Sequence, residues 1–445
     1  MSKNTGKTVG LISLGCDKNR VDSEKLLASI APYYKISQDA ENCDILIINT
    51  CAFLESSRRE AIETVFEYAH LKTDGNLEKL IITGCLPQKF IDELFDSLVE
   101  VDAFLGTFDG SKILELIDEL YKTNKRINWV GKGEELKTER ILTTPEHYAY
   151  LKIADGCNNH CTYCLIPKIR GRYKSYKMED LLLEAKNLGD IQELILVAQD
   201  TTRYGEDLYG ENKFVELIRA LSALENVGSI RLLYCYPDKI SDALINEFNT
   251  NPKLLKYIDI PLQHADDKIL KLMNRPGSFD EYVKLIEKLK TQVEGISIRS
   301  TFITGFPSET EAEHKRLIKF LKKAKLFNAG FFAYSKEMDT PAFKLSNQVH
   351  YRTKLRRQKE LYDVQKEISK NNLSKYLNKK IEVVCDGVDY EKQSFFGRAY
   401  FSAPDVDGLV YFSSDETINQ GDKYIVKITN FDDFDLYGEI ENELT

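Results

Sequence analysis

The sequence contains no hydrophobic run long enough to cross a membrane. The apolar stretch nearest the start, in MSKNTGKTVGLISLGCDKNR, is short and is soon followed by charged residues, unlike a signal peptide. These absences predict a protein that is neither exported nor membrane-bound, and they favour the cytoplasm. No internal repeat or low-complexity tract stands out either, so nothing indicates a repeat array.

Without an export signal, disulfide bonds are not expected. The chain has nine cysteines in 445 residues, and reduced thiols in a cytosol bind metals more often than they pair with one another. Hydrophobic residues make up 42% of the chain, which is ordinary for a globular protein with a real core. The length suits two or three domains.

The end of the chain is poor in basic residues. The segment 376–445 holds six Lys and Arg against fifteen Asp and Glu, whereas the preceding 375 residues hold 55 of each sign. An RNA-binding surface should be basic, because neutralisation of phosphates drives such binding. The acidic segment therefore favours a basic protein partner, the alternative being an acidic surface that serves solubility alone. The preceding residues 343–375 are basic, and this stretch either contacts RNA or is a solvated helix face.

Strand-like and helix-like runs alternate, which predicts an α/β fold. In 1–125, short apolar runs at 8–15, 44–50 and 79–84 are typical of buried parallel strands. This range is predicted to be a flavodoxin-like α/β domain. A polar linker at 126–147 then leads to a second alternation over 148–341. Its six strand runs suit a partial (β/α)6 barrel, and they cover 149–155, 193–199, 230–236, 255–262, 296–305 and 328–334.

Two segments complete the predicted organisation. The residues 342–375 are expected to form a basic helical connector. The last segment, 376–445, is expected to form a small all-β barrel, because turn residues separate five strand runs at 381–387, 395–401, 409–414, 424–430 and 436–441.

Three cysteines, Cys157, Cys161 and Cys164, stand close together in the run DGCNNHCTYC. The spacing C-x3-C-x2-C offers three thiolates from one loop, which can hold three irons of a 4Fe–4S cubane and leave the fourth iron open. Such clusters normally take four cysteines, so an outside ligand is implied. The alternative is a zinc site with His160 as a further ligand, although a ligand next to Cys161 would strain a tetrahedral site.

Three other cysteines each follow a predicted strand directly: Cys16, Cys51 and Cys85. Ligands gather at the carboxyl ends of strands in open α/β sheets, so we expect these thiols to converge at one edge and to form a second metal site. The alternative for each is a small buried hydrophobe. Cysteines without such an arrangement are interpreted as core or surface thiols: Cys43, Cys235 and Cys385.

The triplet spacing resembles that of the radical S-adenosylmethionine (SAM) enzymes, in which SAM fills the open iron site. The whole chain resembles the radical SAM methylthiotransferases, which have a domain with three single cysteines, a radical SAM barrel and a terminal TRAM β-barrel. The resemblance implies that the triplet holds the SAM-cleaving cluster. It also implies that Cys16, Cys51 and Cys85 hold an auxiliary 4Fe–4S cluster used in sulfur insertion, with one SAM as methyl donor and another as radical source.

Contacts to SAM are expected at the mouth of the barrel. Tyr163, just before the last cysteine of the triplet, is placed to pack against the adenine. Three more candidates lie at predicted strand ends that face the same mouth, where active groups of barrels sit: Gln199, Asp200 and Gly305. Similar places are taken by Gln263–His264 and Phe306–Pro307. Plain packing or a turn is the alternative for each of them.

The methylthiotransferases have two branches, which modify either an adenosine derivative in transfer RNA or the β-carbon of an aspartate in ribosomal protein uS12. The runs LGCDKNRVDSE, GCNNHCTYCLIPKIRG, AQDTTRYGEDLYG and GRAYFSAPDVDGLVYF resemble the uS12 branch, although Asp17 replaces its usual proline. We therefore expect a monomeric enzyme that binds uS12 through the acidic barrel, contacts the small ribosomal subunit and receives electrons from a donor protein. The alternatives are a transfer RNA substrate and a non-catalytic, zinc-stabilised ribosome-binding module.

Overall fold

The computed structural model describes residues 6–415 and 417–440, so Glu441 of the last predicted strand run lies outside the described residues. The chain divides into two compact units. The first unit comprises Met1–Thr143, Asp155–His160 and Cys164–Lys174. The second comprises Thr144–Ala154, Cys161–Tyr163 and Ser175–Thr445.

The first unit contains a six-stranded parallel sheet with the order β2-β1-β3-β4-β5-β6. The predicted runs form its long strands β1 (Thr8–Ser13), β3 (Ile45–Thr50) and β4 (Lys79–Gly84). Every residue of β3 and β4 is buried, because helices cover both faces of the sheet. The outer strands are too short to give a sequence signal: β2 (Lys35–Ser37), β5 (Ala103–Phe104) and β6 (Ile127–Asn128).

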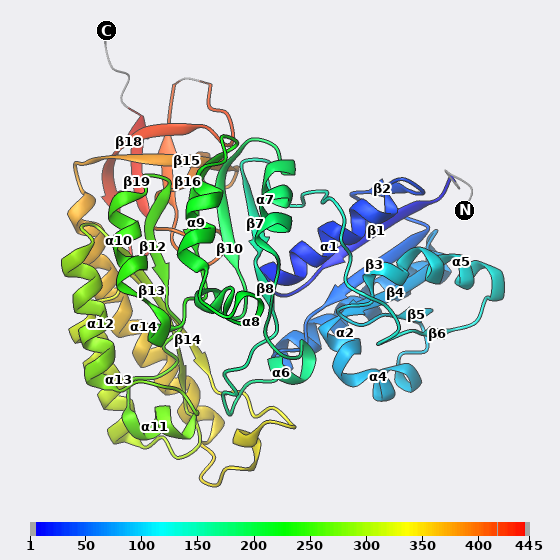
Figure 1. Ribbon diagram of the computed structural model, residues 1–445, viewed down its shortest axis with the longest axis horizontal. Helices are drawn as coiled ribbons and strands as arrows, with labels where there is room; N and C mark the ends of the chain where they lie inside the picture. Colours follow the sequence, from blue (N-terminus) through cyan, green and yellow to red (C-terminus); the bar gives the residue numbers. More distant parts are fainter. Residues whose placement is uncertain (1–5, 416, 441–445) are drawn as a thin grey trace. The chain divides into compact units, whose positions relative to one another are not determined.

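Two separate cores hold helices against the two faces of this sheet (Figure 1). One core contains residues of α1 (Asp17–Ile30) and α5 (Ile113–Thr123), and the other contains residues of α2 (Glu55–Ala69) and α4 (Cys85–Ser97). The short helices α3 (Leu71–Asp74) and α6 (Ile166–Ile169) complete the unit. The predicted α/β fold of this part is confirmed.

The segment 126–147, predicted to be a linker or surface excursion, is attached to the first unit over most of its length. Its start forms β6, and it belongs to the first unit as far as Thr143. The Glu24 carboxylate of α1 is buried and binds the Arg140 guanidinium and the backbone N–H of Thr143. Asp109 accepts hydrogen bonds from the backbone N–H groups of Gly131 and Gly133, each at 2.7 Å. These contacts hold the polar segment to the first unit.

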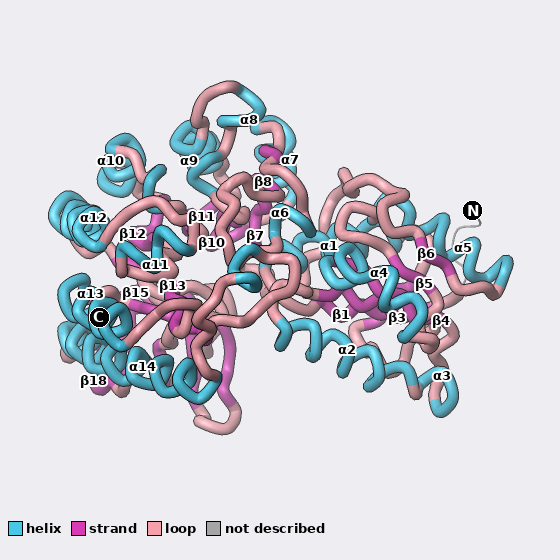
Figure 2. Tube along the Cα trace, turned by 90° about the horizontal axis from the view of Figure 1, so that it is seen from below, coloured by secondary structure: helices cyan, strands magenta, loops and turns pink. Residues whose placement is uncertain are grey.

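The second unit contains an open parallel sheet with the order β14-β13-β12-β11-β10-β7, as a partial barrel requires. Helices lie along the outside of these strands (Figure 2). The strands are β7 (Tyr148–Lys152), β10 (Ile191–Val197), β11 (Val227–Leu232), β12 (Leu254–Asp259), β13 (Ser297–Thr304) and β14 (Asn328–Ala333). The short strands β8 (Ala154–Asp155) and β9 (Lys174–Ser175) pair with each other. The helices are α7 (Met178–Asn187), α8 (Glu206–Tyr209), α9 (Phe214–Ser222), α10 (Asp242–Thr250), α11 (Asp267–Leu272), α12 (Phe279–Gln292) and α13 (Glu311–Ala324).

A long helix and a closed β-barrel complete the second unit, as predicted. The helix α14 (Tyr351–Leu373) packs against α13 and β14. The barrel has the strand order β15-β16-β17-β19-β18 and a core of its own. Its strands are β15 (Lys380–Asp389), β16 (Ser394–Arg398), β17 (Val410–Ser413), β18 (Lys423–Phe431) and β19 (Leu436–Ile440). In the part of the chain that the structure describes, every helix is too short or too polar to span a bilayer.

Buried charges join the terminal barrel to the open sheet. The Glu193 carboxylate of β10 accepts hydrogen bonds from Arg231 of β11 and from Arg398 of β16, and Arg398 also donates to Asp386 of β15. Burial raises the pKa of Glu193, but the two guanidinium charges outweigh this effect and lower the pKa to about 2. Breaking such a pair leaves a buried charge without a partner, which is strongly destabilising.

We expect Arg398→Met to lower the free energy of unfolding by about 3 kcal/mol, because Glu193 and Asp386 lose a partner in a buried site. The folded-state pKa of Glu193 is depressed below 4.5, so its pairing stabilises the fold at higher pH and is lost as the pH falls from about 4.5 towards 2. The difference between variant and parent should shrink over that window. Urea unfolding at several pH values measures this.

The matched control is Lys423→Met, which removes an exposed pair with Glu382 and should cost less than about 1 kcal/mol. Equal losses for the two variants would contradict the stabilising role of the buried network.

Candidate metal centres

The structure brings Cys16, Cys51 and Cys85 together at the carboxyl edge of the first unit's sheet. Cys16 precedes α1, Cys51 directly follows β3, and Cys85 is the first residue of α4 after β4. A Cβ atom placed on Gly15 would lie 2.6 Å from Cys51 Cβ, so the chain at Cys16 runs directly against Cys51. The convergence expected from the strand ends is therefore present in the fold.

Two asparagines fix the backbone around these thiols. Asn19 of α1 donates through Nδ2 to the carbonyl oxygens of Leu14 (3.0 Å) and Thr50 (3.1 Å). Its Oδ1 accepts a long hydrogen bond from the Cys85 thiol, with an S–O distance of 3.8 Å. Asn49 of β3 donates to the Asn19 carbonyl at 2.9 Å. The side chain of Asn19 thus ties together the ends of β1 and β3 and contacts the third cysteine.

Burial controls the ionisation of two of these thiols, Cys51 and Cys85. Burial raises the pKa of Cys51, and the neighbouring Cys16 raises it further. Burial also raises the pKa of Cys85, to about 11, against the opposing charge of Arg170. Metal ligation requires thiolates, so iron would have to displace protons that the buried site otherwise retains.

Arg170 supplies a buried cation beside the same three cysteines. Its side chain is 1% exposed, and its guanidinium donates to Asp155 Oδ2 (2.7 Å), Asn19 Oδ1 (2.6 Å) and Asp22 Oδ2 (3.1 Å). All of these residues belong to the first unit. The cation therefore has two carboxylate partners and one amide that also contacts Cys85.

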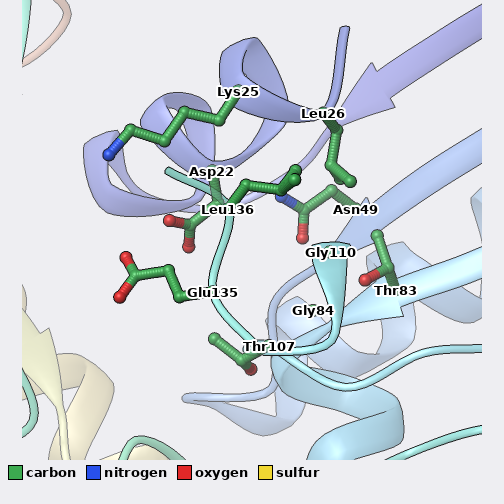
Figure 3. A pocket seen from close by; sticks show the side chains of 10 residues that line it. All are labelled: Asp22, Lys25, Leu26, Asn49, Thr83, Gly84, Thr107, Gly110, Glu135 and Leu136. Carbon is green, nitrogen blue, oxygen red and sulfur yellow. The ribbon is translucent and has the colours of Figure 1, made fainter. Parts of the chain in front are cut away.

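A small cavity opens at this edge of the sheet (Figure 3). Side chains from α1, including Asp22 and Lys25, line it together with Asn49, Thr83 and Gly84 at the ends of β3 and β4. The cavity shares Asp22 with the ion pair of Arg170 and Gly84 with the turn into Cys85. The cavity therefore lies beside the candidate metal site.

The triplet loop is divided between the two units, with Cys157 and Cys164 in the first and Cys161 in the second. The Cys157 N–H donates to the Gly171 carbonyl at 3.2 Å. Two sulfurs accept backbone hydrogen bonds, Cys157 from Asn159 N–H at 3.5 Å and Cys164 from Ile166 N–H at 3.4 Å. Hydrogen bonds to cysteine sulfurs stabilise the thiolate form, as iron ligation requires.

His160, the residue considered as a zinc ligand, is exposed and has a φ of 49°.

In the second unit, Cys161 Sγ lies 3.5 Å from the Tyr236 hydroxyl and 3.7 Å from Arg275 Nη1. The buried Arg275 guanidinium stacks over the Tyr236 ring at 4.3 Å and donates to the Tyr163 hydroxyl at 3.4 Å. Tyr163 packs edge-on against Phe306, with ring centroids 6.5 Å apart. The predicted SAM contact Tyr163 is thus fixed next to Cys161 by an arginine that the sequence did not single out.

The other predicted SAM contacts occupy different environments. Gln199 follows β10, and its Oε1 is buried with no hydrogen-bond partner among the described residues. The Asp200 carboxylate is buried and bound by Thr202 Oγ1 (2.7 Å) and Arg203 Nε (2.9 Å). Gly305 has a φ of 72° and donates its N–H to Glu309 at 2.8 Å. Gln199 is therefore the candidate whose unused acceptor suits a ligand, whereas Asp200 and Gly305 already have structural roles.

Two further residues from the predicted strand ends also have structural contacts. His264 is buried, its Nδ1 accepts from the Asp266 N–H at 2.9 Å, and its Nε2 lies 3.5 Å from Glu309 Oε2. Gln263 adopts a φ of 70° and forms a parallel bridge with Phe302.

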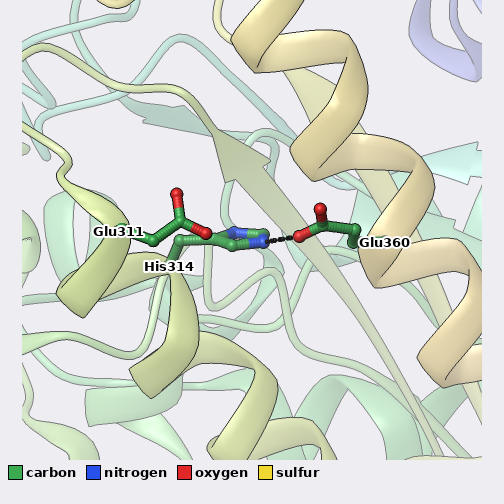
Figure 4. A group of neighbouring side chains, drawn as sticks. All are labelled: Glu311, His314 and Glu360. Atoms are coloured by element: carbon green, nitrogen blue, oxygen red, sulfur yellow. Dashed lines mark hydrogen bonds and ion pairs between the residues drawn. The ribbon is translucent and has the colours of Figure 1, made fainter.

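A third group of potential metal ligands lies between α13 and α14 (Figure 4). The ligand atoms of Glu311, His314 and Glu360 lie within 4.8 Å of one another, and His314 Nε2 is 2.8 Å from Glu360. Arg356 pairs with both glutamates, and Arg357 pairs with Glu311. Because arginine already balances the carboxylate charge, we interpret this group as an ion-pair network that holds α14 against α13.

The three remaining cysteines are buried: Cys43, Cys235 and Cys385. Cys43 belongs to the core between α2 and the sheet, Cys235 lies 3.6 Å from Thr201 Oγ1, and Cys385 belongs to the core of the terminal barrel. Their surroundings are those of small hydrophobes.

Sequence reasoning missed Arg170, Asn19 and Arg275. Arg170 and Asn19 lie within runs that carried the family resemblance, and Asn19 is three residues after Cys16 at the start of a helix. Arg275 lies far from the triplet in the chain, and no pattern around it predicts its contact with Cys161.

The chain matches family models in three consecutive parts. Residues 151–321 match the radical SAM superfamily, residues 8–106 match the uncharacterized protein family UPF0004, and residues 379–440 match the TRAM domain. A solved radical SAM methyltransferase, TsrM from Kitasatospora setae, has the same fold with a TM-score of 0.55 and 12% identity, over 77% of each chain. The protein is therefore a radical SAM enzyme by class.

Relatives of known name cover nearly the whole chain. The ribosomal protein uS12 methylthiotransferase RimO of Acetivibrio thermocellus is 43% identical over 98% of this chain and 99% of its own. Proteins of the same name from Clostridium botulinum and a Thermoanaerobacter species are 44% and 45% identical, over 98% and 97% of this chain and 98% and 100% of their own. This chain belongs to the family of ribosomal protein uS12 methylthiotransferases.

We expect Gly15→Ala to reduce bound iron from about eight to about four per chain, as the loss of one of two 4Fe–4S clusters would. The new Cβ would collide with Cys51 in a backbone with a φ of 91°. Iron and sulfide analysis after anaerobic reconstitution measures this.

Gly131→Ala is the matched control, because Gly131 also has a positive φ (77°) but an added Cβ there meets nothing within 4 Å. If Gly15→Ala bound as much iron as Gly131→Ala, the three N-terminal thiols would not be the ligands of the second cluster.

Proposed function

We propose that the chain inserts a methylthio group at the β-carbon of an aspartate of ribosomal protein uS12, using SAM and two 4Fe–4S clusters. The observation that carries this proposal is the gathering of Cys16, Cys51 and Cys85 at one sheet edge, in a chain that is 41–45% identical over its length to uS12 methylthiotransferases. We assign the auxiliary cluster to these three cysteines and the SAM-cleaving cluster to Cys157, Cys161 and Cys164.

When bound, the cluster at the triplet supplies an electron to SAM and so yields a radical that abstracts hydrogen from carbon. A radical route suits this substrate, because a β-methylene next to a carboxylate has no easily removed proton at neutral pH. Arg275 and Tyr236 hold the side chain of Cys161, while Tyr163 and Phe306 belong to an apolar cluster that excludes water near it. Gln199 Oε1, buried without a hydrogen-bond partner among the described residues, is our proposed acceptor for a ligand hydrogen bond.

A basic protein substrate is supported by the charges of the second unit. Exposed acidic residues of the terminal barrel include Glu382, Glu391, Asp405, Asp415, Asp422, Asp432 and Glu439. We propose that this acidic surface attracts uS12, since complementary charge speeds encounter and orients the partner.

The basic stretch before the barrel gives less support to an RNA substrate. Lys354 and Arg357 of α14 are buried, and four other basic side chains of α14 form ion pairs: Arg356, Lys359, Lys366 and Lys370. Lys366 and Lys370 both pair with Asp433 of the barrel. Most of the charge on α14 is therefore used within the unit and not available to phosphates.

Three further expectations belong to this proposal. The enzyme acts in the cytoplasm, where ribosomal proteins are available, and it acts as a monomer. A separate electron-donor protein reduces the clusters, because the reaction consumes electrons. A contact with the small ribosomal subunit is expected if uS12 is modified after assembly.

With reconstituted enzyme, SAM, sulfide and a reductant, we expect uS12 to gain one methylthio group, located at an aspartate by mass spectrometry of its peptides. Raising the ionic strength should increase KM for uS12, because salt screens the attraction between exposed charges.

Transfer RNA from cells that lack adenosine methylthiolation is the matched comparison substrate. Modification of the RNA and not of uS12 would overturn the proposed substrate. A colourless anaerobic protein that holds zinc would instead favour the non-catalytic ribosome-binding module.

The two cysteine sets should have separable roles. We expect Cys157→Ala to abolish SAM cleavage, whereas Cys51→Ala should leave SAM cleavage intact and stop methylthiolation. Chromatographic detection of 5′-deoxyadenosine measures the first activity, and the mass of uS12 measures the second. Loss of both activities in Cys51→Ala, with its fold and triplet cluster intact, would argue against separate roles.

A further inference from the structure

We propose that Arg170 is a positioning residue that raises the reduction potential of the auxiliary cluster. The inference rests on the proposed function, in which Cys16, Cys51 and Cys85 hold that cluster. It concerns a residue that is not a ligand but lies among the ligands in the first unit.

Arg170 is one polar atom away from the Cys85 thiol. Its guanidinium donates to Asn19 Oδ1 at 2.6 Å, and the same oxygen accepts from the Cys85 thiol at 3.8 Å. Asp22 and Asp155 hold the other side of the guanidinium at 3.1 and 2.7 Å. With 1% of its side chain exposed, Arg170 cannot turn away to solvent, so its charge is fixed beside the cysteines.

A fixed cation at this place must act on the cluster's redox equilibrium. Cluster potentials depend on net charge, hydrogen bonds and solvent exposure. The reduced cluster carries one more negative charge than the oxidised one, and a buried cation stabilises the more negative form because the interior screens charge weakly. The guanidinium does not lose its proton. Asp22 and Asp155 oppose the effect, so the potential reflects the balance of these three charges.

Arg170 also connects the N-terminal cysteines with the triplet loop within the first unit. Asp155 precedes the triplet loop and Arg170 follows it, so their ion pair closes the loop that carries Cys157 and Cys164. Three partners at different positions require the planar fork of donors that arginine has and lysine lacks. Arg170 therefore positions the triplet loop and the start of α1 relative to each other.

The test measures the midpoint potential of the auxiliary cluster by an anaerobic titration followed by electron paramagnetic resonance. The full chain carries Cys157→Ala, Cys161→Ala and Cys164→Ala, so that only the auxiliary cluster is loaded. In this background we expect Arg170→Gln to lower the potential and Asp22→Asn to raise it. Arg172→Gln is the matched control: it removes the same charge from an exposed side chain two residues away, and it should leave the potential unchanged.

Each outcome bears on the proposal. Equal potentials for Arg170→Gln and Arg172→Gln would overturn it. If Arg170→Gln binds no iron, Asp22→Asn decides: a raised potential supports the inference, and an unchanged potential overturns it. A background chain that binds no iron overturns the auxiliary-site assignment itself, a failure distinct from an unmoved potential.

Discussion

The carboxyl ends of parallel strands lie at the same edge of their sheet, and the chemistry of this protein depends on that constraint. Cys16, Cys51 and Cys85 are more than thirty residues apart in the chain. They meet because β1, β3 and β4 are neighbours in the sheet, and a cysteine follows each strand directly or within three residues. The helices that cover both faces bury the site and raise the pKa of Cys51 and Cys85. The fold thus creates a buried set of thiols that suits a metal cluster better than free cysteines.

Burial then requires partners for every charge near the site. Arg170, Asp22, Asp155 and Asn19 form one connected group, and the Glu193–Arg231–Arg398 network plays the same part between the open sheet and the terminal barrel. The two networks differ in consequence. The one in the second unit fastens two sheets to each other, whereas the one in the first unit places a cation beside a proposed redox centre.

The sequence predicted those features that local patterns encode. The long strands are continuous apolar runs, the triplet has a specific spacing, and the single cysteines sit at strand ends, so the fold class and the convergence of Cys16, Cys51 and Cys85 could be inferred. Two- and three-residue edge strands such as β5 have no periodicity to detect. Backbone N–H groups of the predicted linker 126–147 bind distant partners, Glu24 and Asp109, which its polar composition does not reveal. Arg275 reaches Cys161 only through tertiary structure, which no local pattern records.

The central claim is that one chain holds two iron–sulfur clusters of which only one binds SAM. Mössbauer spectroscopy of the full chain, reconstituted with isotopically enriched iron and recorded with and without SAM, tests it most directly. The account predicts two equal populations of 4Fe–4S iron, with a change on addition of SAM in one population alone. A single cluster that accounts for all the bound iron, or two clusters that both respond to SAM, would contradict it.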